Sequence, residues 1–232
     1  MKIGGIIRFT MVDFPGRLAC TVFTIGCNFR CPYCYNKDIV FGTANGEDIE
    51  AFFEWLKRRK GKLDGVAITG GEPTLWSDLL DFISRIKDMG FEVKIDTNGS
   101  NPDMLRRIVN SGNVDYIAMD VKAPLVPEEY AKITGGWRDV NSIRRSIQII
   151  MCSNIPYEFR TTIVPRFHDE KSITSIGEVI QGARLWALQG FVPADTVIDP
   201  ALRREKAYPP WKIKKLAALA EKYVEKVELR GV

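Results

Sequence analysis

Short apolar runs alternate along the chain with segments in which apolar residues recur every three or four positions. The first pattern predicts buried β-strands, and the second predicts amphipathic helices. This alternation favours an α/β fold with a parallel sheet over a sandwich or a helical bundle. We expect strands that are mostly apolar on both faces, as in buried parallel sheets, at residues 18–24, 65–69, 91–96, 114–120, 157–164 and 184–191, and a seventh at 226–230 that caps the sheet.

The predicted helices have recognisable apolar faces and ends. The first carries an apolar stripe at residues 49, 52, 53 and 56, which is the spacing of one helix face. Capping residues and glycines bound the others, because Ser, Asn and Asp side chains cap helix N-termini and glycine often ends a helix. These helices are expected from Ser77 to Gly90, from Asn101 to Gly112, from Asp139, from Ser172, and from Pro210 to about Lys222.

The number of strand and helix pairs limits the choice of fold. Gly and Pro fall singly at element ends, so we expect a single domain over residues 1–232, with an N-terminal lead-in at 1–16 and a C-terminal helix and strand at about 201–232. About six βα units are too few for a closed eight-unit barrel. The first expectation is therefore a partial, open α/β barrel, and the alternative is a doubly wound sheet.

Composition and charge exclude several classes of protein. Hydrophobic residues make up 45% of the chain and charged residues 27%, which is typical of a soluble globular protein. No apolar run approaches the ~18 residues that span a bilayer. The net charge of +4, from 33 basic and 29 acidic residues, is too balanced to predict a nucleic-acid partner. Arg8, Asp13 and Pro15 interrupt any signal-peptide core, so a cytoplasmic protein is expected.

Three of the five cysteines, Cys27, Cys31 and Cys34, follow the first predicted strand closely. The spacing C-x3-C-x2-C places three soft thiolate donors in one loop, which suits a metal centre better than a disulfide framework. A structural zinc site needs four protein ligands. A cubane iron-sulfur cluster held by three cysteines instead keeps one iron open to another ligand. The alternatives are free cysteines, or a zinc knuckle completed by His168, Cys20 or Cys152.

Polar motifs follow the predicted strands at their carboxyl ends, where parallel α/β folds gather functional groups. Gly70 and Gly71 allow close approach of backbone to a ligand, and Glu72 suits recognition of an amino group. A plain turn is the alternative for this segment. Five such loops are expected to converge on one mouth.

Charged and amide side chains at the later strand ends need partners, because an unpaired buried carboxylate is costly. Asp96, Asn98 and Asp120 end otherwise apolar strands. They either face a ligand, or Asp96 and Asn98 make turn hydrogen bonds while Asp120 pairs with Lys122. Arg160 holds either a ligand carboxylate or a strand-end ion pair.

These residues carry a resemblance to a known family. CNFRCPYC, with the aromatic Tyr33 before its last cysteine, resembles the three-cysteine signature of the radical S-adenosylmethionine (radical SAM) enzymes. Almost the whole chain is similar to the activating enzymes of glycyl-radical enzymes. The similarity is greatest to the activating proteins of anaerobic ribonucleoside-triphosphate reductase in their longer form, which resemble pyruvate formate-lyase activase. The matching segments are MVDFPGR, ITGGEPT, KIDTNG, YIAMDVKAP, EFRTTIVP and VELRG.

The resemblance implies a fold, two cofactors and a set of contacts. The implied fold is a partial (β/α)6 TIM-like barrel, in which the three cysteines hold a 4Fe-4S cluster whose open iron binds the amino and carboxylate groups of SAM. The Gly-Gly-Glu segment clamps the amino group, Asp96 and Asp120 face the ribose or a monovalent cation, and Lys122 reaches the methionine carboxylate. The residues expected to contact the cofactors are Tyr33, Tyr35, Gly70, Gly71, Glu72, Asp96, Asn98, Asp120, Lys122 and Arg160.

The implied reaction is radical chemistry on a protein. An electron from the cluster cleaves the sulfonium of SAM into methionine and a 5′-deoxyadenosyl radical, which takes a hydrogen atom from a glycine Cα of a glycyl-radical enzyme. The expected partners are that enzyme and a flavodoxin- or ferredoxin-like electron donor, without nucleic acid or membrane. Two alternatives remain open: a radical SAM enzyme with a small-molecule or peptide substrate, and a zinc or iron-sulfur binding module without catalytic activity.

The chain departs from the family pattern at two places. Tyr35 stands where many relatives have a histidine after the last cysteine, and Leu188–Phe191 stands where pyruvate formate-lyase activases carry a SAM-contacting histidine. Both departures weaken the pyruvate formate-lyase assignment more than the radical SAM assignment. His168 is expected to be a loop residue and not a ligand.

Overall fold

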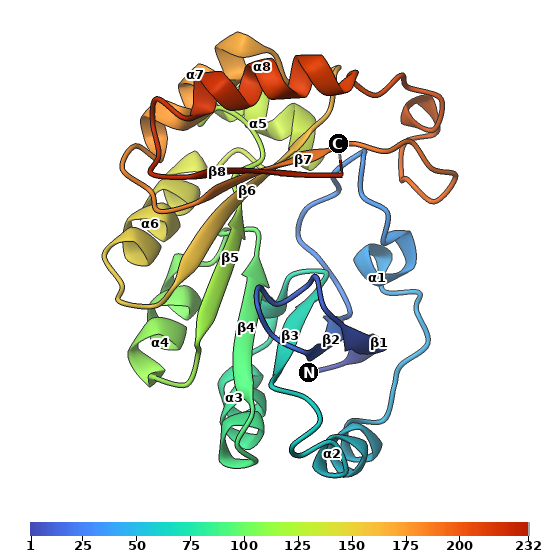
Figure 1. The fold of residues 1–232 in the computed structure, drawn as a ribbon. Helices are drawn as coiled ribbons and strands as arrows, with labels where there is room; N and C mark the ends of the chain where they lie inside the picture. The colour runs from blue at the N-terminus through green and yellow to red at the C-terminus, as the bar shows by residue number, and fades with distance from the viewer. Residues whose placement is uncertain (232) are drawn as a thin grey trace.

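The strands lie in one sheet, in the order in which they occur along the chain (Figure 1). The computed structural model describes residues 1–231. β1 pairs antiparallel with β2, and each later pairing is parallel. The strands are β1 (Ile3–Thr10), β2 (Ala19–Thr24), β3 (Gly65–Gly70), β4 (Glu92–Thr97), β5 (Tyr116–Asp120), β6 (Tyr157–Ile163), β7 (Trp186–Gly190) and β8 (Val227–Arg230).

Helices connect the parallel strands; α3, α4, α6, α7 and α8 lie along the outer side of the curved sheet, whereas α1 lies on its open side (Figure 1). They are α1 (Lys37–Phe41), α2 (Ile49–Lys57), α3 (Leu79–Asp88), α4 (Pro102–Ser111), α5 (Pro127–Thr134), α6 (Val140–Met151), α7 (Glu170–Val179) and α8 (Pro210–Ala220), with 3-10 turns at Pro73–Leu75 and Pro200–Leu202. Among residues 1–231, no helix has the length and apolar character needed to cross a bilayer.

The sheet is curved but open. Within the described residues, β1 and β8 are its two edges and do not pair with each other. The parallel strands from β2 to β7 are each followed by at least one helix, and β8 adds a last parallel strand beside β7, as predicted. The strand order runs without the reversal that a doubly wound sheet requires. These features confirm the partial barrel.

Four elements differ from the sequence analysis. β1 lies within the segment expected to be a lead-in, and it is held by pairing with β2, with Ile6 opposite Val22. The short helices α1 and α5 were not predicted. α7 begins after Asp169 and not at Ser172, because these two residues cap the helix reciprocally. Oδ1 of Asp169 accepts the N–H of Ser172 at 2.9 Å, and Oγ of Ser172 accepts the N–H of Asp169 at 2.8 Å.

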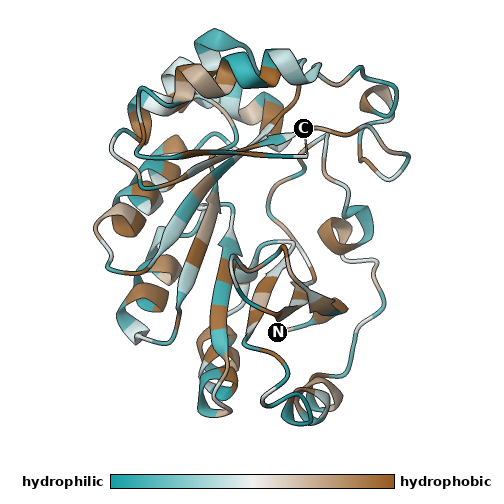
Figure 2. Cartoon of the chain, in the orientation of Figure 1, coloured by the Kyte–Doolittle hydropathy of each residue, from teal (hydrophilic) through white to brown (hydrophobic). Residues whose placement is uncertain are grey.

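The strands are also less apolar than predicted. In β4, Val93 and Ile95 are fully buried in the apolar core, whereas Lys94 and Asp96 alternate with them on the opposite face and form an ion pair. Arg160 of β6 joins this ion-pair group. Figure 2 shows hydrophilic and hydrophobic positions alternating along the central strands. The inner face of the open barrel is therefore polar, and it leads to the candidate site.

Candidate functional site

One pocket lies at the carboxyl ends of the parallel strands. Its volume is about 280 Å³, near the lower end of the range for small-molecule sites. The pocket gathers the loops after β2, β3, β4, β5 and β6, as predicted, and every predicted site residue except Glu72 lines it. The lining residues are Cys27, Phe29, Cys31, Tyr33, Cys34, Tyr35, Asn36, Val40, Thr69, Gly70, Gly71, Asp96, Thr97, Asn98, Asp120, Lys122, Arg160, Thr162 and Gln189.

The cysteine loop brings three thiols to this pocket. Cys31 is buried, and Cys27 and Cys34 are half-buried. The backbone N–H of Phe29 donates to Sγ of Cys27 at 3.3 Å, and the N–H of Cys34 donates to the carbonyl of Cys31 at 3.0 Å. Burial raises the pKa of the Cys27 thiol to about 12 and that of Cys31 to about 11. Metal binding at these cysteines must therefore displace protons.

The donor set fits a three-cysteine cluster. The thiols of Cys27, Cys31 and Cys34 belong to one loop and line one pocket. In this conformation, however, no three Cys, His, Asp or Glu side chains within residues 1–231 lie close enough together to surround a metal ion. A three-cysteine cluster requires this set of donors and no fourth protein ligand.

The zinc alternative lacks a fourth ligand at the pocket. Cys20 is buried in β2, and Cys152 is exposed at the end of α6. His168 is a buried loop residue whose Nδ1 accepts the N–H of Val164 at 3.0 Å and whose Nε2 lies 2.9 Å from the carbonyl of Lys122. None of these three candidates lines the pocket.

Close contact between two loops requires the two glycines at the end of β3, Gly70 and Gly71. A Cβ on Gly71 would overlap the carbonyl of Gly26, and Gly70 has a φ of +116°, with a Cβ there overlapping the backbone of Thr24. The N–H groups of Gly71 and Glu72 donate to the carbonyls of Thr24 and Gly26, both at 2.8 Å. The glycines therefore let the β3 loop pack on the start of the cysteine loop, besides lining the pocket.

The Glu72 carboxylate does not line the pocket and ties two loops together. It is fully buried. Its Oε1 accepts from the N–H and hydroxyl of Thr74, at 3.1 and 2.5 Å, and from the hydroxyl of Thr97 at 2.7 Å, while its Oε2 accepts the N–H of Asn98 at 2.7 Å. Burial raises the pKa of Glu72, although these donors oppose the rise. Glu72 is thus the one predicted site residue whose carboxylate is held by protein donors outside the pocket lining, and its contact with a ligand amino group stays a prediction.

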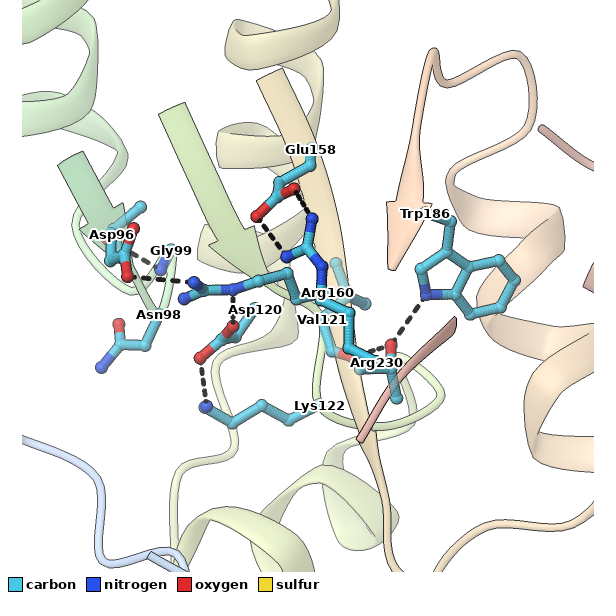
Figure 3. A network of polar contacts seen from close by, with 12 residues as sticks. Asp96, Asn98, Gly99, Asp120, Val121, Lys122, Glu158, Arg160, Trp186 and Arg230 are labelled. Carbon is cyan, nitrogen blue, oxygen red and sulfur yellow. Dashed lines mark hydrogen bonds and ion pairs between the residues drawn. The ribbon is translucent and has the colours of Figure 1, made fainter. Parts of the chain in front are cut away.

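Charged side chains of β4, β5, β6 and the loop after β5 form one network, in which Asp96, Asp120, Lys122 and Arg160 line the pocket (Figure 3). Asp120 and Arg160 lie in register on neighbouring strands. Arg160 donates from Nε to Asp120 at 2.8 Å and from Nη1 to Asp96 at 2.9 Å. Lys122 donates to Asp120 at 2.9 Å, and Lys94 pairs with Asp96. Burial alone would raise the pKa of both aspartates, but these cations lower it below its usual range.

The network includes the predicted ion pairs, and Asp96, Asp120, Lys122 and Arg160 also line the pocket, so their contact with a ligand stays a prediction. Arg160 makes strand-end ion pairs, and Asp120 pairs with Lys122. Each of the four carboxylate oxygens of Asp96 and Asp120 accepts a hydrogen bond from a basic side chain, so both negative charges are paired within the network. Lys94 was missed by the sequence analysis, although its position two residues before Asp96 in a strand places both on one face.

Helix α5 supports the cysteine loop from behind. The N–H of Arg30 donates to the carbonyl of Thr134 at 2.7 Å. The ring of Phe29 stands edge-on to Tyr130, with centroids 6.2 Å apart, and tilts against Trp137 at 5.3 Å. These residues position the loop, and the sequence analysis did not identify them because it did not predict this helix.

The segment between β7 and α8, residues 191–209, is fastened to the cysteine loop. The N–H of Asp199 donates to the carbonyl of Pro32 at 2.9 Å. The hydroxyl of Tyr35 donates to the carbonyl of Val192 at 2.6 Å and accepts its N–H at 3.1 Å. Tyr35 therefore lines the pocket while its hydroxyl holds the following segment in place.

The fold and the pocket define a class of protein: an open α/β barrel with a three-cysteine loop at the carboxyl ends of its strands. The Radical SAM superfamily model matches residues 21–174, which is more than half of the chain. The chain belongs to the radical SAM superfamily, whose members use a 4Fe-4S cluster and SAM.

Similar proteins agree with this family. A Methanocaldococcus jannaschii protein named “Putative glycyl-radical enzyme activating enzyme” is 31% identical over 233 residues, covering 99% of this chain and 96% of the relative. The pyruvate formate-lyase-activating enzyme of Listeria monocytogenes is 29% identical over 192 residues. The match covers 78% of this chain and 76% of that enzyme.

Solved structures share the fold at low identity. TYW1 with a lysine-pyruvate adduct bound matches with a TM-score of 0.64 at 19% identity, covering 88% of this chain and 73% of that one. Streptococcus suis SuiB bound to precursor peptide SuiA matches with a TM-score of 0.64 at 13% sequence identity. The match covers 91% of this chain and 48% of the SuiB chain. These two likenesses concern the fold alone.

Proposed function

We propose that this radical SAM enzyme generates a glycyl radical on a partner enzyme. The observation that carries the proposal is the single pocket in which three thiols of one loop meet the polar carboxyl ends of the parallel strands. Similarity along almost the whole chain to a relative named for glycyl-radical enzyme activation supports it. The first candidate partner is anaerobic ribonucleoside-triphosphate reductase, because the sequence motifs resemble those of its activating protein, and the second is pyruvate formate-lyase.

The residues of the pocket divide into two groups in this proposal. Cys27, Cys31 and Cys34 would hold the 4Fe-4S cluster and leave one iron without a protein ligand. When bound, the cluster supplies the electron that cleaves SAM reductively, and a flavodoxin- or ferredoxin-like protein is the expected source of that electron. Lys122 presents a buried ammonium group at the pocket wall for the carboxylate of SAM.

Other side chains order the cysteine loop around this chemistry. The amide nitrogen of Asn98 lies 3.9 Å from Sγ of Cys27 and donates to the side-chain oxygen of Asn28 at 2.9 Å. Hydrogen bonds to cysteine sulfur tune a bound cluster, so Asn98 acts on the site through Cys27. Tyr33 lies buried beside Cys31, where its hydroxyl lowers the pKa of that thiol while burial raises it more strongly.

The open side of the barrel suits a protein substrate. Within residues 1–231, the edge strands β1 and β8 leave the sheet unclosed. A loop of a partner enzyme can approach a pocket through such an opening, whereas a closed barrel is filled by its own side chains.

Radical SAM chemistry is tested by anaerobic reconstitution with iron and sulfide, reduction, addition of SAM and detection of 5′-deoxyadenosine by chromatography with mass detection. The Cys31→Ala variant is expected to lose the product. The matched control is Cys152→Ala, which changes an exposed cysteine outside the pocket and is expected to retain the product. Undiminished product from Cys31→Ala would overturn the cluster assignment.

The glycyl-radical step is tested with each candidate partner enzyme. The reconstituted protein, SAM and a reductant are incubated anaerobically with purified anaerobic ribonucleoside-triphosphate reductase or pyruvate formate-lyase, and the glycyl radical is measured by electron paramagnetic resonance. A radical on one partner identifies it. Cleavage of SAM without a radical on either partner contradicts the two named partners and favours a small-molecule or peptide substrate.

A further inference from the structure

Two polar side chains next to Asn98 have no part in the proposed function. Asn98 and Ser100 are buried in the loop after β4, and Asn28 follows Cys27 in the cysteine loop. The amide nitrogen of Asn28 donates to Oγ of Ser100 at 2.8 Å, and that of Asn98 donates to Oδ1 of Asn28 at 2.9 Å. Neither Asn28 nor Ser100 lines the pocket. Their side chains form a chain of hydrogen bonds that ends at Asn98, which does line it.

One backbone group fixes the orientation of both amides. The N–H of Ser100 can only donate, and it donates to Oδ1 of Asn98 at 2.9 Å. The NH2 group of Asn98 must therefore point the other way, toward Asn28 and Cys27. Asn28 must then present its oxygen to Asn98 and its own NH2 group to Ser100. Turning either amide over would set two donors against each other.

The two hydrogens of the Asn98 amide have two acceptors within reach. Its Nδ2 lies 2.9 Å from Oδ1 of Asn28 and 3.9 Å from Sγ of Cys27. Because Asn28 takes one hydrogen, the second is left for the sulfur. A neutral thiol at this distance is a weak acceptor, whereas the thiolate that binds metal is charged and accepts more strongly. The amide is thus directed at the sulfur before the sulfur binds iron.

A hydrogen bond to a ligand sulfur changes the redox properties of an iron-sulfur cluster. Reduction adds negative charge to the cluster and its sulfurs. A donor N–H stabilises the more negative, reduced state more than the oxidised state, so it raises the reduction potential. The backbone N–H of Phe29, 3.3 Å from the same sulfur of Cys27, acts in the same direction.

We infer that Asn28, held by Ser100, positions the Asn98 amide so that one of its hydrogens bonds to Sγ of Cys27, and that this bond raises the reduction potential of the cluster. The inference rests on the proposed function, because it requires Cys27 to be a cluster ligand. Asn28 is a positioning residue in this account, since its side chain acts through Asn98. The cluster is then easier for an electron donor to reduce.

The inference is tested by an electron paramagnetic resonance redox titration of the reconstituted protein without SAM. Omitting SAM removes any direct contact between Asn98 and the substrate. Asn98→Ala is expected to shift the midpoint potential to a more negative value, because the hydrogen bond to sulfur is lost. Asn28→Ala is expected to shift it in the same direction by a smaller amount, because the Asn98 amide remains but is no longer held on one side.

The matched control is Asn101→Ala. The Asn101 amide also joins two loops, since its oxygen accepts the N–H of Met104 at 3.1 Å and its nitrogen donates to the carbonyl of Thr74 at 2.7 Å. Asn101 does not line the pocket. Its variant is expected to lose stability in thermal unfolding and to keep the wild-type midpoint potential. A purely structural role of Asn98 and Asn28 predicts that same pattern for their variants.

Two outcomes would overturn the inference. One is a wild-type midpoint potential in Asn98→Ala or in Asn28→Ala, and the other is a shift in Asn101→Ala as large as theirs. If Asn98→Ala loads too little iron for a titration, Asn28→Ala decides alone, because its change lies outside the pocket lining.

Iron and sulfide content separates this failure from failure of the proposed function. If wild-type protein loads no more iron than Cys31→Ala, the cluster assignment itself fails, and the role of Asn28 fails with it. If the potentials shift as expected but neither partner enzyme acquires a radical, the inference stands and only the partner assignment fails.

Discussion

The substitution Glu72→Gln distinguishes a structural carboxylate from a ligand contact. Glutamine keeps the size of the side chain and one acceptor oxygen, which can still serve Thr74 and Thr97. The introduced NH2 group replaces Oε2 and faces the N–H of Asn98, so that two donors meet where the native protein has a bond of 2.7 Å. The β3 and β4 loops then lose one of the hydrogen bonds between them, the bond from the N–H of Asn98.

The size of the effect follows from the buried hydrogen bonds. A hydrogen bond to a charged group contributes about 1.5–3 kcal/mol, and a buried donor left unpaired costs about 1–3 kcal/mol. The free energy of unfolding is therefore expected to fall by about 3–5 kcal/mol, a large part of the roughly 5–15 kcal/mol of a typical domain. For a chain of this size the melting temperature should fall by at least about 6 °C.

The assay is thermal and urea unfolding of metal-free protein, followed by circular dichroism in the absence of SAM. The matched control is Glu128→Gln, which changes an exposed carboxylate paired with exposed Arg138 at 3.0 Å and should alter stability by less than about 1 kcal/mol. The reasoning is refuted if metal-free Glu72→Gln unfolds like Glu128→Gln while SAM binding weakens, because that result assigns the carboxylate to the ligand.

Further predictions concern the loop contact, the ion-pair network and the buried histidine. Gly71→Ala adds a Cβ that overlaps the backbone of Gly26 just before the cysteine loop. The iron content after reconstitution should therefore fall, and the free energy of unfolding should drop by about 1–3 kcal/mol or more. The control Gly5→Ala, which has open space around its Cβ, should retain iron. Arg160→Ala leaves two partly buried carboxylates with one basic partner each and should lower the free energy of unfolding in urea by about 1.5–3 kcal/mol; wild-type stability would contradict the network. Burial lowers the pKa of His168 in the folded protein. As the pH falls through about 6.5, the histidine of the unfolded chain therefore binds a proton before that of the folded chain does. The free energy of unfolding consequently decreases below that pH. Because His168 is the one histidine of the sequence, the melting temperature of wild-type protein should fall between pH 7.5 and 5.5, and that of His168→Gln should change less.

Elements with strong local signals were predictable from the sequence. The side chain of Asn101 accepts the N–H of Met104 at 3.1 Å, and Gly112 ends α4 in the left-handed conformation, as its spacing predicted. β1 was missed because its sequence shows no clear alternation and its order depends on pairing with β2. α5 was missed although Pro127 and Gly135 bound it, because a helix of eight residues presents little periodicity.

The sequence predicted which residues belong to the candidate site better than it predicted which groups those residues contact. Cys27, Cys31 and Cys34 were found from their spacing, and the strand-end motifs were placed at one mouth by the rule for parallel sheets. The structure changed the interpretation of Glu72, whose buried carboxylate holds two loops together. It also added Tyr130, which carries no motif and lies beside the site only because α5 packs on the cysteine loop.

The sequence by itself determined the family, the metal-binding chemistry and the α/β alternation, because ligand type, ligand spacing and hydrophobic period are properties of short segments. Only the tertiary structure decided which polar groups are partners. Asp120 and Arg160 lie 40 positions apart and meet because β5 and β6 pair in that register. Lys94 and Asp96 are neighbours in sequence, yet their burial follows from the curvature of an open sheet with a polar inner face. Register and packing depend on the whole chain at once, so no local pattern specifies them.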